Sequence, residues 1–183
     1  MQILKSSYQQ LPNLIAQGAK LTPMMEQFHD IKVQYPEALL FFRMGDFFEL
    51  FFEDATLAAK YLNITLTSRG QILDTAIPMA GFPHFAAANY VDKLTSIGLR
   101  IVICDQIENP KFAKGIVKRA VVQICSPGLP YDIDRSNSLE QHFVAAAFND
   151  KNKWSLALVD FVHGDFFVVD CTSAQQVFDY LKL

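Results

Sequence analysis

The chain has 183 residues, of which 51% are hydrophobic and 19% charged, and its formal net charge is −3. This composition predicts a globular protein and excludes a disordered chain. The negative charge disfavours a general nucleic-acid binder, because counterion release by basic residues supplies most non-specific affinity, but a local patch can still contact DNA. No apolar run approaches the ~20 residues of a membrane span, and the first ten residues lack the apolar core of a signal peptide. We therefore expect a cytoplasmic protein with no membrane partner.

The first elements follow from capping and spacing. Residues 1–20 have mixed polarity, and we expect them to be a loosely attached N-terminal extension. A helix is predicted to begin at Thr22-Pro23, because Thr is a good N-cap and Pro is tolerated at the first helical position. Pro36 is predicted to end it. Its buried face is predicted from side chains at helical spacing: Met24, Phe28, Ile31 and Tyr35.

The next segments alternate between strand and helix patterns. The apolar run 38–43 predicts a buried strand, and Gly45 and Asp46 then supply a turn and an N-cap for a helix from about 46 to 62. The later elements are predicted as a strand at 63–67, a polar loop at 68–75, a short extended piece at 77–81, a helix at 84–97 stopped by Gly98, and strands at 99–104 and 118–125. This alternation predicts an α/β (α+β) domain with a mixed β-sheet flanked by helices.

A break in the pattern follows at Ser126-Pro127-Gly128, and the polar stretch 129–140 is predicted to be a linker. Beyond it, strands are predicted at 143–148, 154–161 and 166–171, with a helix beginning near Ser173. Three strands and a helix are too few to close a comfortable core. Residues 141–183 therefore look like the truncated beginning of a second domain.

An aromatic ring and a carboxylate stand two residues apart at Phe47 and Glu49, directly after the Gly45-Asp46 bend. A ring can wedge between base steps, and a carboxylate can accept a hydrogen bond from a base edge. The ordinary alternative is that Phe47 pairs with Phe51 in a helical core and that Glu49 is a solvated residue near a helix N-terminus.

Basic residues gather in one later segment, at Lys111, Lys114, Lys118 and Arg119, and Arg69 lies in the predicted polar loop. Any one of them alone is most often a solvated surface charge. As a group they suit contacts to phosphates, which position a protein on DNA without specifying sequence.

The sequence motifs do not indicate a metal site, a nucleotide-binding loop or a disulfide bond. The four histidines have no zinc-type spacing, and neither GxxxxGK[ST] nor GxGxxG occurs. We therefore expect no metal and no cofactor in this chain. Cys104, Cys125 and Cys171 are widely spaced in apolar settings, which predicts reduced, mostly buried thiols.

From Leu21 onward the chain resembles the bacterial MutS family of DNA mismatch repair proteins, in several blocks that occur in the same order. The blocks are TPMMEQ (22–27), RMGDFFELF (43–51), LTSRG (66–70), IPMAGFPH (77–84), ICDQ (103–106) and SPG (126–128). The resemblance implies that residues 21–128 form a mismatch-recognition domain. It also implies that 141–183 begin a connector domain with an RNase H-like fold.

The resemblance gives the candidate site its roles. It implies that Phe47 wedges into the base stack from the minor groove and that Glu49 hydrogen-bonds the displaced base. With the basic residues added, the other side chains expected to bind DNA are Met44, Gly45, Asp46, Arg69, Met79, Lys114, Lys118 and Arg119.

The resemblance also implies that the full-length protein is a DNA-binding ATPase. That protein would use ATP and Mg, pair with a second MutS subunit and bind MutL, and it would associate with the nucleoid when on DNA. The ATPase part is absent from this chain, so we expect a DNA-binding segment that is not itself an enzyme.

Two alternatives remain. Asp160, Asp165 and Asp170 lie on or beside two predicted paired strands, and RNase H-like nucleases hold two metal ions with such carboxylates. The chain can also be a protein-interaction module that docks a partner through its aromatic surface, and substitution of Phe47 would separate that role from mismatch recognition.

Overall fold

The computed structural model describes residues 6–113, 115–127, 131, 143–151, 153–160 and 163–182. The chain divides into two compact units, Met1–Ser126 and Pro127–Leu183. The first unit contains α1 (Gln10–Ala16), α2 (Pro23–Lys32), β1 (Leu39–Met44), β2 (Phe47–Phe51), α3 (Phe52–Leu62), β3 (Thr67–Ile72), β4 (Thr75–Pro83), the 3-10 helix η1 (His84–Ala86), α4 (Ala87–Ser96), β5 (Ile101–Gln106) and β6 (Arg119–Cys125). The second contains β7 (Phe143–Asp150), β8 (Lys153–Asp160), β9 (Asp165–Cys171) and α5 (Ala174–Tyr180).

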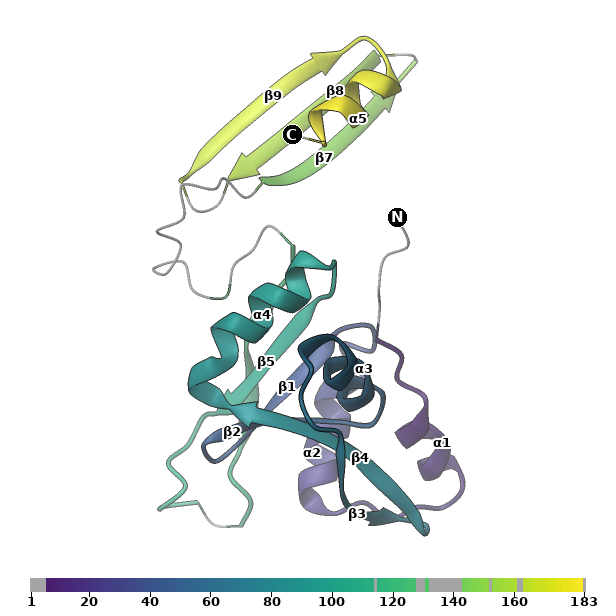
Figure 1. Ribbon diagram of the computed structural model, residues 1–183, viewed down its shortest axis with the longest axis vertical. Helices are drawn as coiled ribbons and strands as arrows, with labels where there is room; N and C mark the ends of the chain where they lie inside the picture. The colour runs from purple at the N-terminus through teal and green to yellow at the C-terminus, as the bar shows by residue number, and fades with distance from the viewer. Residues whose placement is uncertain are drawn as a thin grey trace. The chain divides into compact units, whose positions relative to one another are not determined.

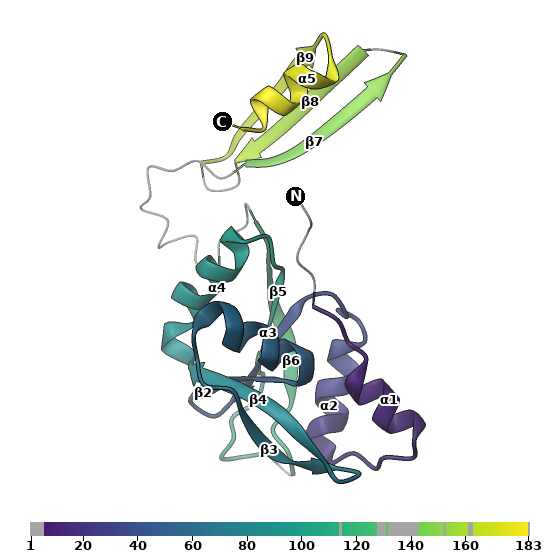
Figure 2. The same cartoon turned by 45° about the vertical axis from the view of Figure 1, so that its right-hand side comes forward.

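The described strands of the first unit form one sheet in the order β3-β4-β2-β1-β5-β6. β1 and β5 pair in parallel and the other neighbours pair antiparallel, so the sheet is mixed. Helices α1 and α2 lie on one side of this sheet and α4 on the other (Figures 1 and 2). Helix α3 packs against β2, β4 and α4. The predicted α/β fold class, with a mixed sheet flanked by helices, is confirmed.

Aromatic side chains fill the core on both faces of this sheet. On the face covered by α2, which we call the α2 face, the Phe28 ring meets Phe42 and Phe51 edge-on at centroid distances of 5.7 and 5.3 Å. On the opposite face, Phe41 and Phe82 pack at 4.9 Å. Strands buried on both sides have nearly continuous apolar sequences, and this explains the local excess of phenylalanine.

Helix α2 begins as predicted. The hydroxyl oxygen of Thr22 accepts the Met25 N–H at 3.3 Å, and Pro23 occupies the first turn. Phe28 and Ile31 are buried as expected, but Met25 is more deeply buried than Met24.

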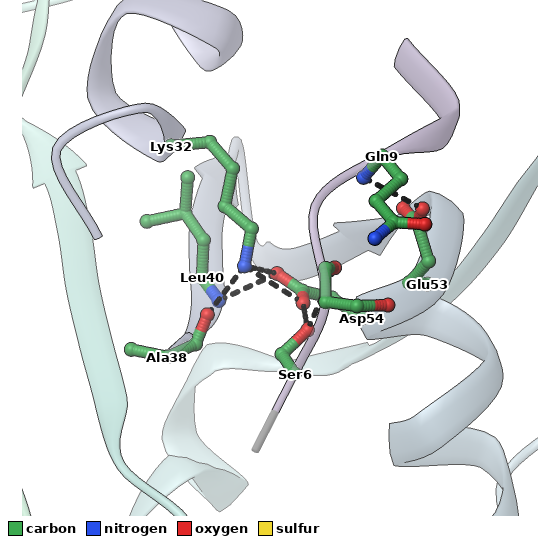
Figure 3. Close-up of polar contacts among 8 residues, drawn as sticks. Ser6, Gln9, Lys32, Ala38, Leu40, Glu53 and Asp54 are labelled. Atoms are coloured by element: carbon green, nitrogen blue, oxygen red, sulfur yellow. Dashed lines mark hydrogen bonds and ion pairs between the residues drawn. The ribbon is translucent and has the colours of Figure 1, made fainter. Parts of the chain in front are cut away.

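The expectation of loose attachment is wrong for the described part of the N-terminal segment, residues 6–20. Leu11 and Leu14 of α1 are buried in the same cluster as α2 and the sheet. The Ser6 hydroxyl bonds the buried carboxylate of Asp54, and the backbone N–H of Gln9 donates to Glu53 at 3.0 Å (Figure 3). The segment is therefore an integral part of the first unit.

The prediction of a helix from residue 46 is wrong at its start. Residues 47–51 form β2, which pairs antiparallel with β1, and Met44 and Phe47 are the paired residues on either side of the turn. Helix α3 begins only at Phe52. Gly45 has a φ of 61° at the first position of this two-residue turn, the sign that a type II′ hairpin requires there. Gly45 and Asp46 therefore form a hairpin turn and not a helix cap.

The segment 63–83 also differs from its prediction. Asn63 caps α3 in the left-handed conformation, so the strand expected at 63–67 begins only at Thr67. The expected loop 68–75 is instead the hairpin of β3 and β4, whose turn residues Leu73 and Asp74 both have positive φ. The helix expected at 84–97 and the strands at 99–104 and 118–125 are confirmed, with small shifts of their bounds.

The second unit is a meander in the order β7-β8-β9 with α5 packed on it. Ser173 caps α5 by accepting the Gln176 N–H at 3.2 Å, so the predicted helix start is confirmed. The predicted linker 129–140 lies outside the described residues except for Tyr131. In the described parts of the chain, no helix has the length and apolar character of a membrane span.

Candidate nucleic-acid interface

Phe47 and Glu49 project from the same face of β2. Side chains of a strand alternate between faces, so residues two apart share a side, about 7 Å from each other. Phe48, between them, is buried on the opposite face against Phe41 and Phe82. Phe47 is 47% exposed. In a helix these two side chains would point in different directions. Because residues 47–51 form a strand, the ring and the carboxylate lie together on the α2 face.

The neighbouring strands place both predicted methionines on this face. Met44 of β1 lies opposite Phe47, and Met79 of β4 lies opposite Phe51. Directly paired residues share a face, and both methionines are half-buried against the α2 cluster. Gly45 and Asp46 are exposed at the hairpin turn beside Phe47, where the Asp46 carbonyl accepts the His84 N–H at 2.9 Å.

Arg69 and Glu49 form an ion pair across the sheet. The Nη1 atom of Arg69 lies 2.5 Å from Oε1 and 2.7 Å from Oε2 of Glu49. The Glu49 side chain is only 12% exposed, whereas that of Arg69 is 45% exposed. Burial raises the pKa of Glu49 above its usual value, and the charge and hydrogen bond of Arg69 oppose this shift.

Gly81 is the cross-strand neighbour of Glu49. It lies directly opposite Glu49 on β4, which separates β2 from β3 in the sheet. A Cβ at this position would stand 3.1 Å from the Phe48 carbonyl oxygen and 3.5 Å from Cγ of Glu49. The missing side chain thus leaves space on β4 beside the Glu49 side chain.

Arg119 is held in place by the α2 face. Its Nε donates to the Arg43 carbonyl at 2.5 Å, and one Nη1 donates to Gln27 of α2 at 3.0 Å. Nη2 lies 3.3 Å from the sulfur of Met44, and the guanidinium covers the Phe42 ring at 4.8 Å. Burial lowers the pKa of Arg119, while the charge of Glu49 helps to raise it. These contacts anchor the half-buried Arg119 to β1 and α2, and a role for it in DNA binding stays a prediction.

The remaining basic residues separate into different settings. Lys111 and Lys118 are exposed, and the backbone N–H of Lys118 donates to Glu108 at 2.7 Å. Lys114 lies outside the described residues. The structure therefore places Arg69 and Arg119 beside Glu49, and leaves Lys111 and Lys118 in the loop segment before β6.

Three residues of this surface were missed by sequence reasoning: Gly81, Gln27 and Phe42. Gly81 and Gln27 both belong to blocks that carried the family resemblance, 77–84 and 22–27. That signal marked the blocks without indicating a role for either residue. Phe42 reads only as part of an apolar run.

Two of the three candidate metal-binding carboxylates of the second unit make other contacts. Asp160 bonds the His163 ring at 2.7 Å, and Asp170 accepts the Ser155 hydroxyl at 3.0 Å. Within the described residues, no group of three His, Cys, Asp or Glu side chains is arranged to hold a metal ion.

The cysteines agree with the sequence analysis. All three are free and buried. Burial raises the pKa of Cys104 to about 12 and that of Cys125 to about 11. Neither has the lowered pKa of a reactive thiol.

Comparison with known proteins decides the family. Residues 22–133, more than half of the chain, match the family model described as MutS domain I. The chain belongs to the MutS family. This confirms the resemblance drawn from the sequence blocks and identifies the unit that carries Phe47 and Glu49 with MutS domain I.

Individual relatives agree with the MutS assignment. The chain is 48% identical over 152 residues to the DNA mismatch repair protein MutS of Alkaliphilus metalliredigens, covering 83% of this chain and 17% of that protein. It is 48% identical to MutS of Lactococcus lactis over 86% of this chain and 19% of the relative, and 49% identical to MutS of Streptococcus pneumoniae over 81% and 18%. The chain thus spans less than a fifth of these MutS proteins.

Proposed function

We propose that this chain detects mismatched or unpaired bases in duplex DNA, as the first step of mismatch repair. Phe47 enters the base stack from the minor groove, and Glu49 accepts a hydrogen bond from the displaced base. The observation that carries this proposal is the position of an exposed ring and a carboxylate on one face of β2, beside an exposed hairpin turn. The names of the MutS relatives support it.

Stacking energetics explain how a ring can find a mismatch. Separating one base step costs a few kcal/mol and kinks the duplex, and apolar side chains in the minor groove are known to do so. A mispaired base is already less well paired and stacked, so the same wedge costs less there. Phe47 therefore binds best where base pairing and stacking are weak, and it does not need to recognise a particular base sequence.

Glu49 adds selectivity because a carboxylate near phosphates repels DNA. That repulsion lowers the affinity for matched duplex and is offset only where a displaced base offers a donor. Because its pKa is raised, the Glu49 carboxylate also takes up a proton more readily as the pH falls. Lys111 and Lys118, both exposed, are proposed to contact the backbone without distinguishing the two duplexes.

The longer protein has further proposed partners. We assign ATP and Mg binding, pairing with a second MutS subunit and binding of MutL to parts of that protein beyond these 183 residues. The proposed role of this chain is DNA contact alone.

The test is an amide-shift titration of the isotope-labelled chain with a duplex carrying one mismatch and with its matched counterpart. We expect larger shifts at residues 44–49 and Met79 with the mismatch, and loss of the difference in Phe47→Ala. Phe148→Ala, which removes a ring that is 68% exposed in the second unit, is the matched control and should behave as the unsubstituted chain. Equal shifts for both duplexes would overturn the proposal.

A further inference from the structure

Glu49 is largely buried and forms an ion pair with Arg69. Its side chain is 12% exposed, and the more exposed Arg69 side chain contacts both carboxylate oxygens through a single nitrogen, Nη1. Arg69 occupies one acceptor position on each oxygen, so a base that takes these positions must displace the guanidinium. Because one nitrogen makes both contacts, a single rotation of the Arg69 side chain would release both oxygens together.

The backbone around Arg69 favours such a movement. β3 is at the edge of the sheet, and its pairing with β4 shifts register between Ser68 and Gln71, which leaves Arg69 and Gly70 in a bulge. Gly70 has a φ of 71° there. Bulges re-aim side chains and are common beside functional sites. Arg69 therefore contacts Glu49 from an edge-strand segment that pairs with β4 only on either side of the bulge.

We propose that Arg69 is a specificity-determining gate: it closes over Glu49 in the free protein and leaves the carboxylate only when a displaced base offers a hydrogen-bond donor in its place. This inference rests on the proposed function. In matched duplex the bases satisfy one another, so Arg69 stays on Glu49 and weakens, without abolishing, the repulsion between the carboxylate and the phosphates. At a mismatch the displaced base takes the place of Arg69 on Glu49, and Arg69 can then contact the DNA phosphates.

The charges around Glu49 agree with this role. Among the residues that the structure describes, Arg69 from β3 and Arg119 from β6 are basic groups that lower the pKa of Glu49, and Arg119 is held by Gln27, Met44 and the Arg43 carbonyl. Arg69 is the more exposed partner and lies on the edge strand. Of these two arginines, Arg69 is therefore the one placed to give up its contact with Glu49 to a base.

The test measures the ratio of mismatched to matched affinity in four forms of the whole chain: unsubstituted, Arg69→Gln, Glu49→Gln and the double variant. A gate predicts that Arg69→Gln weakens matched binding and raises this ratio about fivefold, because the competitor for Glu49 is gone and matched DNA meets an unneutralised carboxylate. In the Glu49→Gln background, Arg69→Gln should leave the ratio unchanged. Arg69→Lys keeps the charge and should stay within twofold of the unsubstituted chain.

A simple phosphate contact gives a different result. It would lower both affinities by the same factor in both backgrounds, and this outcome would overturn the gate. If the unsubstituted chain does not distinguish the two duplexes, the proposed function fails and the gate fails with it. If it does distinguish them and Arg69→Gln leaves the ratio unchanged, only the gate is wrong.

A measurement without DNA checks the closed state directly. The side-chain carboxyl signal of Glu49 is followed by NMR against pH in the unsubstituted chain and in Arg69→Gln. Loss of Arg69 should move the titration midpoint upward. An unchanged midpoint would show that the ion pair does not exist in solution and would overturn the gate whatever the DNA results.

Discussion

Lys32 and Asp54 form an ion pair that is almost fully enclosed by the first unit. The Nζ atom of Lys32 lies 2.8 Å from both carboxylate oxygens, and the two side chains are 2% and 0% exposed (Figure 3). The Leu40 N–H donates to the same carboxylate at 2.9 Å, and Nζ also bonds the Ala38 carbonyl. The pair thus joins α2, the start of β1 and α3.

Removing one partner of this pair should strongly destabilise the protein. Lys32→Met leaves the Asp54 carboxylate buried without its counter-ion, which costs about 3–5 kcal/mol in comparable cases. The double variant Lys32→Met/Asp54→Leu should recover much of that loss, because no charge remains buried. Urea unfolding at neutral pH measures the free energies, with exposed Lys20→Met as the control. A cost below 1 kcal/mol for Lys32→Met would contradict the enclosed pair.

The hairpin turn should depend on Gly45. Alanine at a φ of 61° is strained, and left-handed backbone costs roughly 1–2 kcal/mol in residues other than glycine. We expect Gly45→Ala to lower stability by about that amount and to reduce mismatch preference through a displaced Phe47. Gly45→Asn should lose a similar amount, because the first position of a type II′ turn lies outside the left-handed α region that Asn tolerates. The exposed neighbour variant Asp46→Ala should change stability by less than about 0.5 kcal/mol, and a similar loss in all three would argue against the turn geometry.

Glu49 should make stability fall as the pH rises. Its pKa is raised in the folded protein by burial, so the folded state binds the proton more tightly than the unfolded chain. The contribution of Glu49 is fully present below the ordinary value of 4.5 and is lost as the pH rises through the raised pKa. The unfolding free energy of the unsubstituted chain minus that of Glu49→Gln, measured from pH 4 to pH 8, should therefore decrease. A difference that grows with pH would mean that Arg69 outweighs burial.

Arg119 and Lys118 should affect different properties although they are adjacent. Arg119→Lys loses the planar group that bonds Gln27 and covers Phe42, so we expect a loss of stability of about 1–2 kcal/mol. Lys118→Gln should leave stability within about 0.5 kcal/mol. It should weaken binding to both duplexes equally and reduce the slope of log affinity against log salt by about 1. Unfolding measurements and DNA titrations at several salt concentrations, made on both variants, test this difference. The opposite pattern of effects in the two variants would contradict it.

Local signals sufficed where one short segment determines its own structure. The Thr22-Pro23 start of α2, the Ser173 cap of α5 and Gly98 after α4 were each predicted and are observed, with Gly98 at a φ of 92°. Each depends on a few adjacent residues whose capping or backbone preferences are strong.

Prediction failed where partners are distant. The run 47–52 is so rich in apolar residues that spacings of two and of 3.6 residues both fit it. What makes 47–51 a strand is pairing with β4, about thirty residues later. The Glu49–Arg69 ion pair likewise joins β2 to the edge strand β3, twenty residues away in sequence, which short-range patterns do not contain. The family resemblance found the right residues, and the sheet explains how they act together.

The contacts of Ser6, Leu11 and Leu14 have a consequence for where this unit begins. Similarity to MutS domain I starts at residue 22, yet the hydroxyl that bonds Asp54 and two buried leucines come from residues before it. The match to the family model and the packed first unit thus begin at different residues of this chain. A fragment trimmed to the similar region would retain every candidate DNA contact while uncovering a buried charge, and its weak binding would be mistaken for a defect of recognition.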